Sequence, residues 1–255
     1  MDRPITLKDA TRFFLPLILM TELNMISKSV IHAFLARMVA PKVALAAFSV
    51  SFGFYYTLTS PTEISMLLSI SYLKSRRAIG HLLGFFCVVL AGPMVVVQLV
   101  AWSSLGDWLY GGVFGASPEA IAQARLATFL LSFSAPILML RALAFAMLML
   151  NRRTVWITYS TLLRLLSLAI SLVVLPRFLA GAPVGAAALV TCMAVETAFA
   201  WAAAWRGFAA LPATEGGPPP PYRELWRFSW PLMMNQASEM GVFALINIFM
   251  GRLAN

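Results

Sequence analysis

Residues 8–37 have the sequence KDATRFFLPLILMTELNMISKSVIHAFLAR. Residues 223–252, RELWRFSWPLMMNQASEMGVFALINIFMGR, are similar to them when position 8 is aligned with position 223. Identical residues stand at these aligned pairs: Arg12/Arg227, Phe13/Phe228, Pro16/Pro231, Leu17/Leu232, Met25/Met240, Ile31/Ile246, Phe34/Phe249 and Arg37/Arg252. This agreement at one fixed offset indicates an internal duplication. Six apolar segments begin before the second copy, and an even number of crossings returns a chain to the same side of a membrane. The two units are therefore predicted to be parallel repeats, as in many transporters.

The composition excludes a soluble globular domain. Hydrophobic residues make up 60% of the 255 positions and charged residues only 11%, whereas soluble domains carry about a quarter charged residues. The net charge of +9 does not indicate nucleic-acid binding, because the basic residues lie at the ends of apolar segments rather than in a stripe. The sequence predicts an all-α polytopic membrane protein whose main partner is the lipid bilayer.

Seven segments are long and apolar enough to be predicted as membrane spans. They cover residues 11–37, 44–73, 79–102, 119–150, 154–176, 184–206 and 225–252. We expect a six-helix bundle over residues 1–210, a cytoplasmic Pro/Gly linker over 211–222, and the first helix of a second bundle over 223–255. Because the sequence ends as this helix is completed, we expect a truncated two-bundle protein or, if it is half-size, assembly with a second copy.

The distribution of lysine and arginine predicts the orientation. If the N-terminus is inside, the inner connections hold Arg3, Lys8, Arg12, Lys74, Arg76, Arg77, Arg152, Arg153, Arg206, Arg223 and Arg227. The outer connections hold Arg37, Lys42, Arg125, Arg177 and Arg252. Since cytoplasmic connections are enriched in basic residues, we expect a multi-pass protein of the cell (inner) membrane with a cytoplasmic N-terminus.

Several short motifs, in order along the chain, resemble one family of membrane proteins. They are Leu35-Ala36-Arg37, Thr59-Ser60-Pro61, Lys74-Ser75-Arg76-Arg77, Leu163-Arg164-Leu165, Ser171 to Pro176, Phe228 to Leu232, and Asn247-Ile248-Phe249. With this spacing, the chain resembles the N-terminal half of the progressive ankylosis protein family, within the MATE-like superfamily of multidrug, oligosaccharide-lipid and polysaccharide exporters. The resemblance implies about twelve spans in two bundles around a central cavity, and transport of anions such as pyrophosphate, citrate or nucleotide. The sequence departs from this pattern by lacking the second bundle.

A polar stripe in the first span is one candidate for a substrate site. Asn24, Lys28 and His32 recur every four residues, a spacing that keeps them within about 80° on one helix face. Such a stripe could line a cavity that binds substrate. The alternative is a hydrogen-bonded network that only fixes helix packing.

Two arginines within spans are candidate anion ligands. Arg141 lies on one face with Ser134 in the fourth span, and Arg164 shares a face with Ser160, Ser167 and Ser171 in the fifth. A guanidinium group bonds two oxygens of a carboxylate or phosphate at once, so both arginines, with Lys28, are predicted to contact an anionic substrate. Alternatively, each arginine pairs internally with Glu22 or Glu196, or Arg141 reaches the membrane boundary.

Three glutamates could bind a coupling ion. Glu22, Glu196 and Glu239 lie within predicted spans, and a carboxyl group at membrane depth can bind H⁺ or Na⁺. A fourth, Glu63, belongs to Ser60-Pro61-Thr62-Glu63, which is typical of a capping box at which a broken span restarts as helix. Gly92-Pro93 in the third span and Pro136 in the fourth predict kinks.

The function predicted from these patterns is a secondary transporter or flippase that exports a small anionic, amphipathic or lipid-linked solute by alternating access. No phosphate-binding loop, zinc-binding His-Glu-x-x-His or nucleophile elbow is present in the sequence, so we expect no enzymatic activity, bound metal or cofactor. The alternatives are a non-transporting fragment or assembly partner, or an intramembrane lipid-modifying enzyme.

Overall fold

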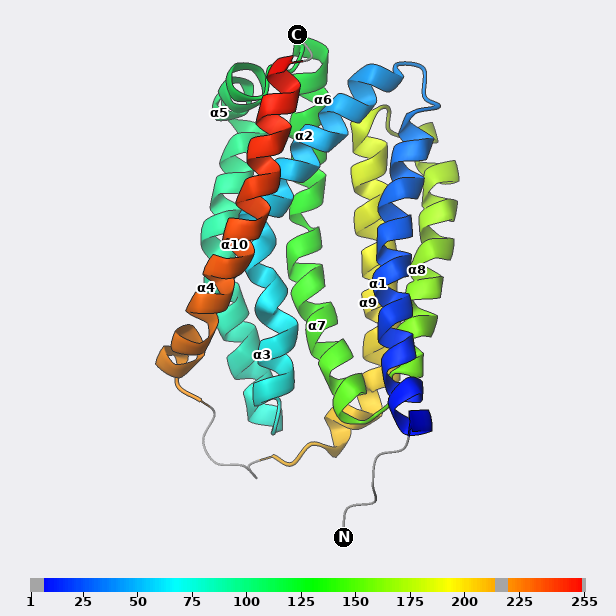
Figure 1. Cartoon of the computed structure of the whole chain (residues 1–255), viewed down its shortest axis with the longest axis vertical. Coiled ribbons are helices and arrows are strands. Elements are labelled where there is room, and N and C mark those ends of the chain that lie inside the picture. Colours follow the sequence, from blue (N-terminus) through cyan, green and yellow to red (C-terminus); the bar gives the residue numbers. More distant parts are fainter. Residues whose placement is uncertain (1–6, 214–219, 254–255) are drawn as a thin grey trace.

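The computed structural model describes residues 7–213 and 220–253, and these residues form helices and connecting turns without a strand. Figure 1 shows an elongated bundle whose helices run alternately between its two ends. Six helical segments are long and apolar enough to cross a membrane. They are Phe13–Leu35, Pro41–Tyr72, Arg76–Trp102, Pro118–Leu150, Val155–Arg177 and Ala182–Ala210. The prediction of an all-α polytopic membrane protein is confirmed.

The helices keep the order expected from the sequence. The bundle contains α1 (Leu7–Leu35), α2 (Pro41–Thr59), the 3₁₀ turn η1 (Ser60–Ile64), α3 (Ser65–Tyr72), α4 (Arg76–Trp102), α5 (Leu105–Asp107), the π-helical η2 (Trp108–Val113), α6 (Pro118–Ser132), α7 (Ser134–Leu150), α8 (Val155–Val174), the 3₁₀ turn η3 (Leu175–Arg177) and α9 (Ala182–Ala210). Helix α9 packs against α6, α7 and α8, whereas α1 packs mainly on α8. Small residues make close packing possible, since Ala120, Ala124 and Ala127 form one buried face of α6.

The second copy of the repeat forms α10 (Tyr222–Leu253), a continuous helix that lies on η1 and α2. Both copies carry a proline inside the helix at the aligned position, Pro16 in α1 and Pro231 in α10. Unlike α1, α10 is not among the six described helices apolar enough to cross a membrane. Its polar residues Asn235, Gln236 and Glu239 account for much of this difference, so its membrane crossing stays a prediction.

The second span is broken where the sequence predicts, but not by the predicted cap. Pro61 has no N–H to bond the Thr57 carbonyl four residues earlier, and the Ser60 hydroxyl donates to that carbonyl instead, at 2.8 Å. Ser60 therefore acts as a substitute donor. No side chain forms a capping hydrogen bond at the start of η1 or α3. The Glu63 side chain is exposed and forms no hydrogen bond with the described residues. The predicted capping box is wrong.

The fourth span is also interrupted. Helix α6 ends at Ser132 and α7 begins at Ser134, with Phe133 between them, close to the predicted kink at Pro136. Phe133 lies three residues before Pro136, within the turn whose backbone bonding a proline disturbs. The Ser134 hydroxyl donates to the Leu131 carbonyl at 2.7 Å, and its oxygen is also hydrogen-bonded to the Tyr55 hydroxyl of α2, at 2.7 Å. The break in the fourth span is thus joined to the second span one turn before the break in that span.

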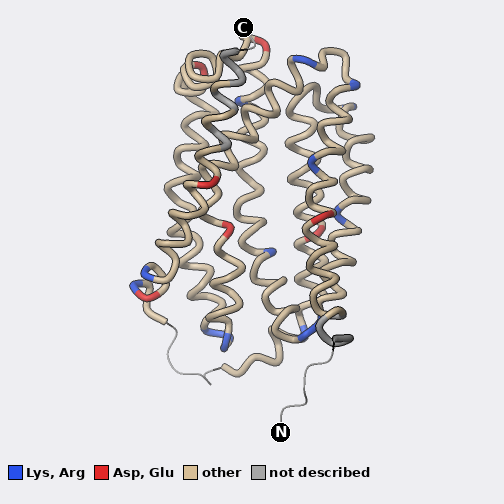
Figure 2. Tube along the Cα trace, in the orientation of Figure 1, with Lys and Arg blue, Asp and Glu red and all other residues tan. Residues whose placement is uncertain are grey.

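Basic residues mark one end of the bundle. Figure 2 shows most of the lysine and arginine positions near the end at which α1 begins and α7 and α9 finish. At this end, Arg76 ties the start of α4 to the end of α9, because its Nε donates to the Leu211 carbonyl at 3.0 Å and its Nη2 to the Ala209 carbonyl. Part of the predicted linker, residues 214–219, lies outside the described residues.

Candidate functional site

A buried carboxylate lies at the centre of the charged residues in the bundle. Glu196 of α9 is fully buried. Its Oε2 accepts from Arg141 Nη1 of α7 at 2.8 Å and from Arg164 Nη1 of α8 at 3.4 Å. Its Oε1 accepts from the Thr161 hydroxyl, also on α8, at 3.1 Å. Three helices therefore meet at one carboxylate, which uses both oxygens.

The first helix joins this cluster through its polar stripe. Arg164 Nη1 also donates to Asn24 Oδ1 of α1, so the side chain links α1 to Glu196. Arg164 is 5% exposed, and its Nε is buried without a hydrogen-bond partner among the described residues. A buried polar group without a partner costs about 1–3 kcal/mol, and more when it is charged. The Cys192 thiol of α9 also lies close to this guanidinium group, but no described oxygen or nitrogen accepts from its Nε.

The cluster carries an excess of positive charge. Two guanidinium groups share the single carboxylate of Glu196, and the structure describes no further carboxylate that pairs with either arginine. The three ionised groups sum to about +1, because arginine stays protonated in proteins. Unbalanced charge at membrane depth is costly by several kcal/mol. We define Asn24, Arg141, Thr161, Arg164 and Glu196 as the arginine cluster.

The serines predicted to accompany Arg164 do not enter this cluster. Ser160 and Ser167 lie on its face of α8, but their hydroxyls donate to the Ile157 and Arg164 carbonyls of the same helix, at 2.7 and 2.9 Å. Short hydroxyl side chains in membrane helices commonly bond in this way. Thr161, which was not singled out from the sequence, reaches Glu196 as well as the Ile157 carbonyl of its own helix, at 3.1 and 3.0 Å. Its position three residues before Arg164, on the same helix face, is the sequence signal that could have identified it.

Lys28 lies near the arginine cluster but contacts a different helix. Its Nζ is 5.4 Å from the ring centroid of Phe52 and 5.0 Å from that of Tyr56, both on α2. Aromatic faces attract a cation and stabilise it where water is scarce. Tyr56 and Phe52 stack on each other, 5.6 Å between centroids. Lys28 is thus held by an aromatic pair rather than by a carboxylate hydrogen bond.

The remaining candidates are dispersed. The Nδ1 atom of His32 lies 2.8 Å from the Lys28 carbonyl, and the exposed His32 ring packs edge-on against Phe48. Glu22 on α1 and Glu239 on α10 are both exposed and form no ion pair within the described chain. Of the three predicted coupling carboxylates, only Glu196 is buried. No three His, Cys, Asp or Glu side chains gather as metal ligands in the described part of the molecule.

No protein-family model, curated protein or solved structure matches this chain. The resemblance to the progressive ankylosis family therefore rests on the sequence motifs alone. The arginine cluster is the structural observation on which a function can be argued.

Proposed function

We propose that this chain is part of a secondary transporter, and that the arginine cluster binds a small anionic solute during alternating access. The observation that carries the proposal is the buried Arg164 side chain, whose Nε lacks an acceptor although the cluster around it has surplus positive charge. A carboxylate or phosphate oxygen would supply both the missing acceptor and the missing negative charge. Ionisable residues at membrane depth are typical of substrate pathways.

The internal repeat supports transport over a purely structural role. Parallel or inverted repeats are the usual architecture of secondary transporters, which bind substrate near the middle of the membrane where repeats meet. In the proposed protein, α1 and α10 are equivalent helices of a MATE-like pair of bundles related to the progressive ankylosis family. We place the basic end of the bundle, with the N-terminus, in the cytoplasm, following the positive-inside rule.

Glu196 has a defined part in this proposal. It holds Arg141 and Arg164 together and partly neutralises them, so an anion can bind and leave without facing two uncompensated cations. Because Glu196 contacts both arginines, it is the carboxylate that we propose as the site of the coupling H⁺ or Na⁺. Glu22 and Glu239, exposed on α1 and α10, contribute to coupling only if the other bundle covers them.

The test is anion flux in liposomes that contain the purified chain. Labelled pyrophosphate, citrate and ATP are loaded separately, and efflux is compared with that from protein-free liposomes. We expect efflux of at least one anion, and its loss in Arg164→Gln but not in Glu22→Gln, which changes an exposed charge on α1. If all three anions stay inside, this chain does not transport them, and a non-transporting assembly partner becomes the better account. Equal efflux from wild type and Arg164→Gln would remove the arginine cluster from the pathway.

A further inference from the structure

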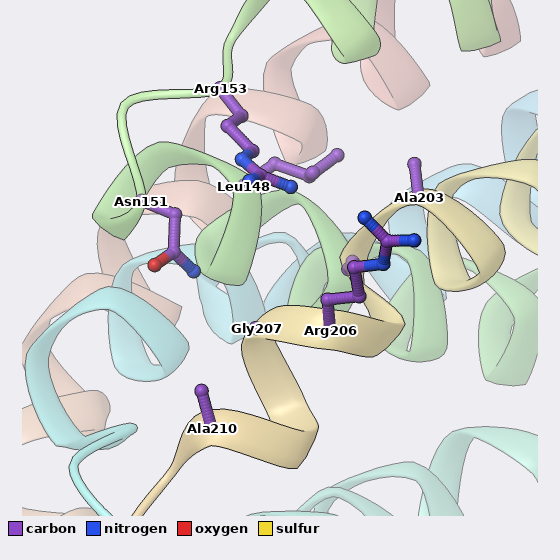
Figure 3. A pocket seen from close by; sticks show the side chains of 8 residues that line it. Leu148, Asn151, Arg153, Ala203, Arg206, Gly207 and Ala210 are labelled. Carbon is purple, nitrogen blue, oxygen red and sulfur yellow. The ribbon is translucent and has the colours of Figure 1, made fainter.

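A second basic site lies at the end of the bundle, apart from the arginine cluster. A cavity of about 160 Å³ opens between the end of α7, the turn that follows it and the last turns of α9. Its charged lining consists of Arg153 from the turn and Arg206 from α9. Figure 3 shows both guanidinium groups extending toward the same space, with Asn151 and Gly207 nearby.

The backbone of the turn aims Arg153 at this cavity. The Arg153 N–H bonds the Leu148 carbonyl at 2.8 Å and the Arg152 N–H bonds the Met149 carbonyl at 2.9 Å, which together form a Schellman motif. Arg152 occupies its left-handed position with φ of 55°, where glycine is usual and a residue with a Cβ atom is strained. The two backbone hydrogen bonds thus keep Arg152 in this strained conformation.

Close packing holds the turn against α9. A Cβ atom at Gly207 would lie 2.6 Å from Asn151 Nδ2 and 2.9 Å from Met147 Sδ, so a side chain there would require Asn151 and Met147 to move. Asn151 Nδ2 donates to the Met147 carbonyl at 2.9 Å, which fixes the side chain under the turn. The absence of a side chain at Gly207 and the hydrogen bond of Asn151 thus allow the turn to lie close to α9 beside the cavity.

The two arginines of the cavity have no anionic partner within the described structure. Neither forms an ion pair, and no Asp or Glu lines the cavity. The carbonyl ends of α7 and α9 supply about half a negative charge each, against two full positive charges. About one positive charge thus stays unbalanced, which favours an anion with several oxygens.

We propose that this cavity binds the phosphate group of an acidic phospholipid. Guanidinium groups bind phosphate through paired hydrogen bonds, and basic pockets between membrane helices at the headgroup level recognise anionic lipids. The other lining residues, Leu148, Ala203, Ala204 and Ala210, offer an apolar wall to the glycerol and upper acyl chain. That wall favours a lipid over free phosphate.

The test is a binding titration of the purified full chain in detergent with dioctanoyl phosphatidic acid, followed by native mass spectrometry. Arg153→Gln/Arg206→Gln is expected to weaken binding about thirtyfold, since each basic residue near a lipid headgroup contributes about 1 kcal/mol. Arg152→Gln is the matched control, because it removes a neighbouring charge that does not line the cavity. We expect it to change binding by less than about twofold, within the ±0.5 kcal/mol typical of surface substitutions. Arg164→Gln should leave lipid binding intact, which separates this site from the proposed transport site.

Three results would overturn the proposal. The first is equal binding by wild type and the double variant when both elute as the same folded species in size-exclusion chromatography. The second is a loss in Arg152→Gln as large as that in the double variant, which would indicate general surface charge. The third is displacement of the lipid by inorganic phosphate at equal concentration, which would assign the cavity to free phosphate.

Discussion

Two arginine–carboxylate pairs in this bundle have similar geometry but opposite surroundings. Arg125 Nη1 of α6 lies 3.0 Å from Asp107 Oδ1, and these side chains are 28% and 55% exposed. Arg141 Nη1 lies 2.8 Å from Glu196 Oε2, with side chains 15% and 0% exposed. The first pair is balanced and lies near the end of the bundle at which α4 ends and α6 begins, whereas the second shares its carboxylate with Arg164. Similar contacts therefore imply different consequences for stability and for function.

The exposed pair costs little to make or break, because water solvates each partner when the contact is lost. The buried cluster has no such solvent, so removing one charge leaves the others uncompensated. A neutral hydrogen-bonded pair can also bridge two membrane helices without surplus charge. For this reason the proposed function uses the surplus charge as its sign of a binding site.

The largest effect is expected for Glu196→Gln. Two buried guanidinium groups would lose their shared carboxylate, and breaking a buried pair in this way costs about 3–5 kcal/mol. The measurement is denaturant or thermal unfolding of the purified chain in detergent. Glu22→Gln serves as the control, because it removes an exposed glutamate without an ion pair among the described residues. Equal stability of the two variants would show that the buried pair does not hold the bundle together.

A smaller effect is expected for Thr161→Val. This nearly isosteric change deletes a hydroxyl whose one proton is shared between Glu196 Oε1 and the Ile157 carbonyl. A full hydrogen bond to a charged group contributes about 1.5–3 kcal/mol, so we expect a loss at or below the lower end of this range. Thr197→Val is the matched control on α9, because the Thr197 hydroxyl bonds only the Met193 carbonyl of its own helix. Unfolding should be easier for Thr161→Val than for Thr197→Val. The reverse order would argue against a stabilising contact at Oε1.

The smallest effect is expected for Asp107→Asn. An exposed ion pair contributes about 0.2–1 kcal/mol, and salt screens it further. Unfolding of this variant should therefore differ little from wild type and still less at high salt. A loss comparable to that in Glu196→Gln would mean that exposure does not separate the two pairs.

Much of the fold follows from the sequence because its physical signals are local. Apolar length predicts six of the seven expected spans, and Pro61 and Pro136 predict the breaks in the second and fourth. At Pro93, where the sequence also predicts a kink, α4 continues without a break. The predicted cap at Ser60 is wrong because the hydroxyl has a nearer use, donating to the carbonyl that Pro61 leaves without a partner. Within a membrane span, a carbonyl group without a hydrogen bond is costly, so the Ser60 hydroxyl bonds the Thr57 carbonyl rather than capping the next helix.

The site could be predicted only in part, because it depends on contacts between helices. The sequence identifies Arg141, Arg164 and Glu196 as charged residues within spans, and internal pairing with Glu196 is one of the alternatives it leaves open. The structure shows one carboxylate bonded to both arginines. This arrangement depends on how α7, α8 and α9 are rotated about their axes, and no local sequence pattern encodes that rotation. The residues of the polar stripe on α1 contact two different helices for a similar reason. Successive steps of four residues turn by about 40°, so Asn24 meets α8 whereas Lys28 meets α2.

The most direct test of the central claim is stabilisation of the purified chain by an anion. Thermal unfolding in detergent is measured with citrate or pyrophosphate, against sodium chloride at equal ionic strength, for wild type and for Arg164→Gln. A ligand that binds only the folded state raises its stability by about 2.7 kcal/mol at 100 times its dissociation constant. We predict that citrate or pyrophosphate raises the unfolding temperature of wild type and that this increase is lost in Arg164→Gln. No increase in wild type with either anion, or the same increase in both proteins, would contradict an anion site at Arg164.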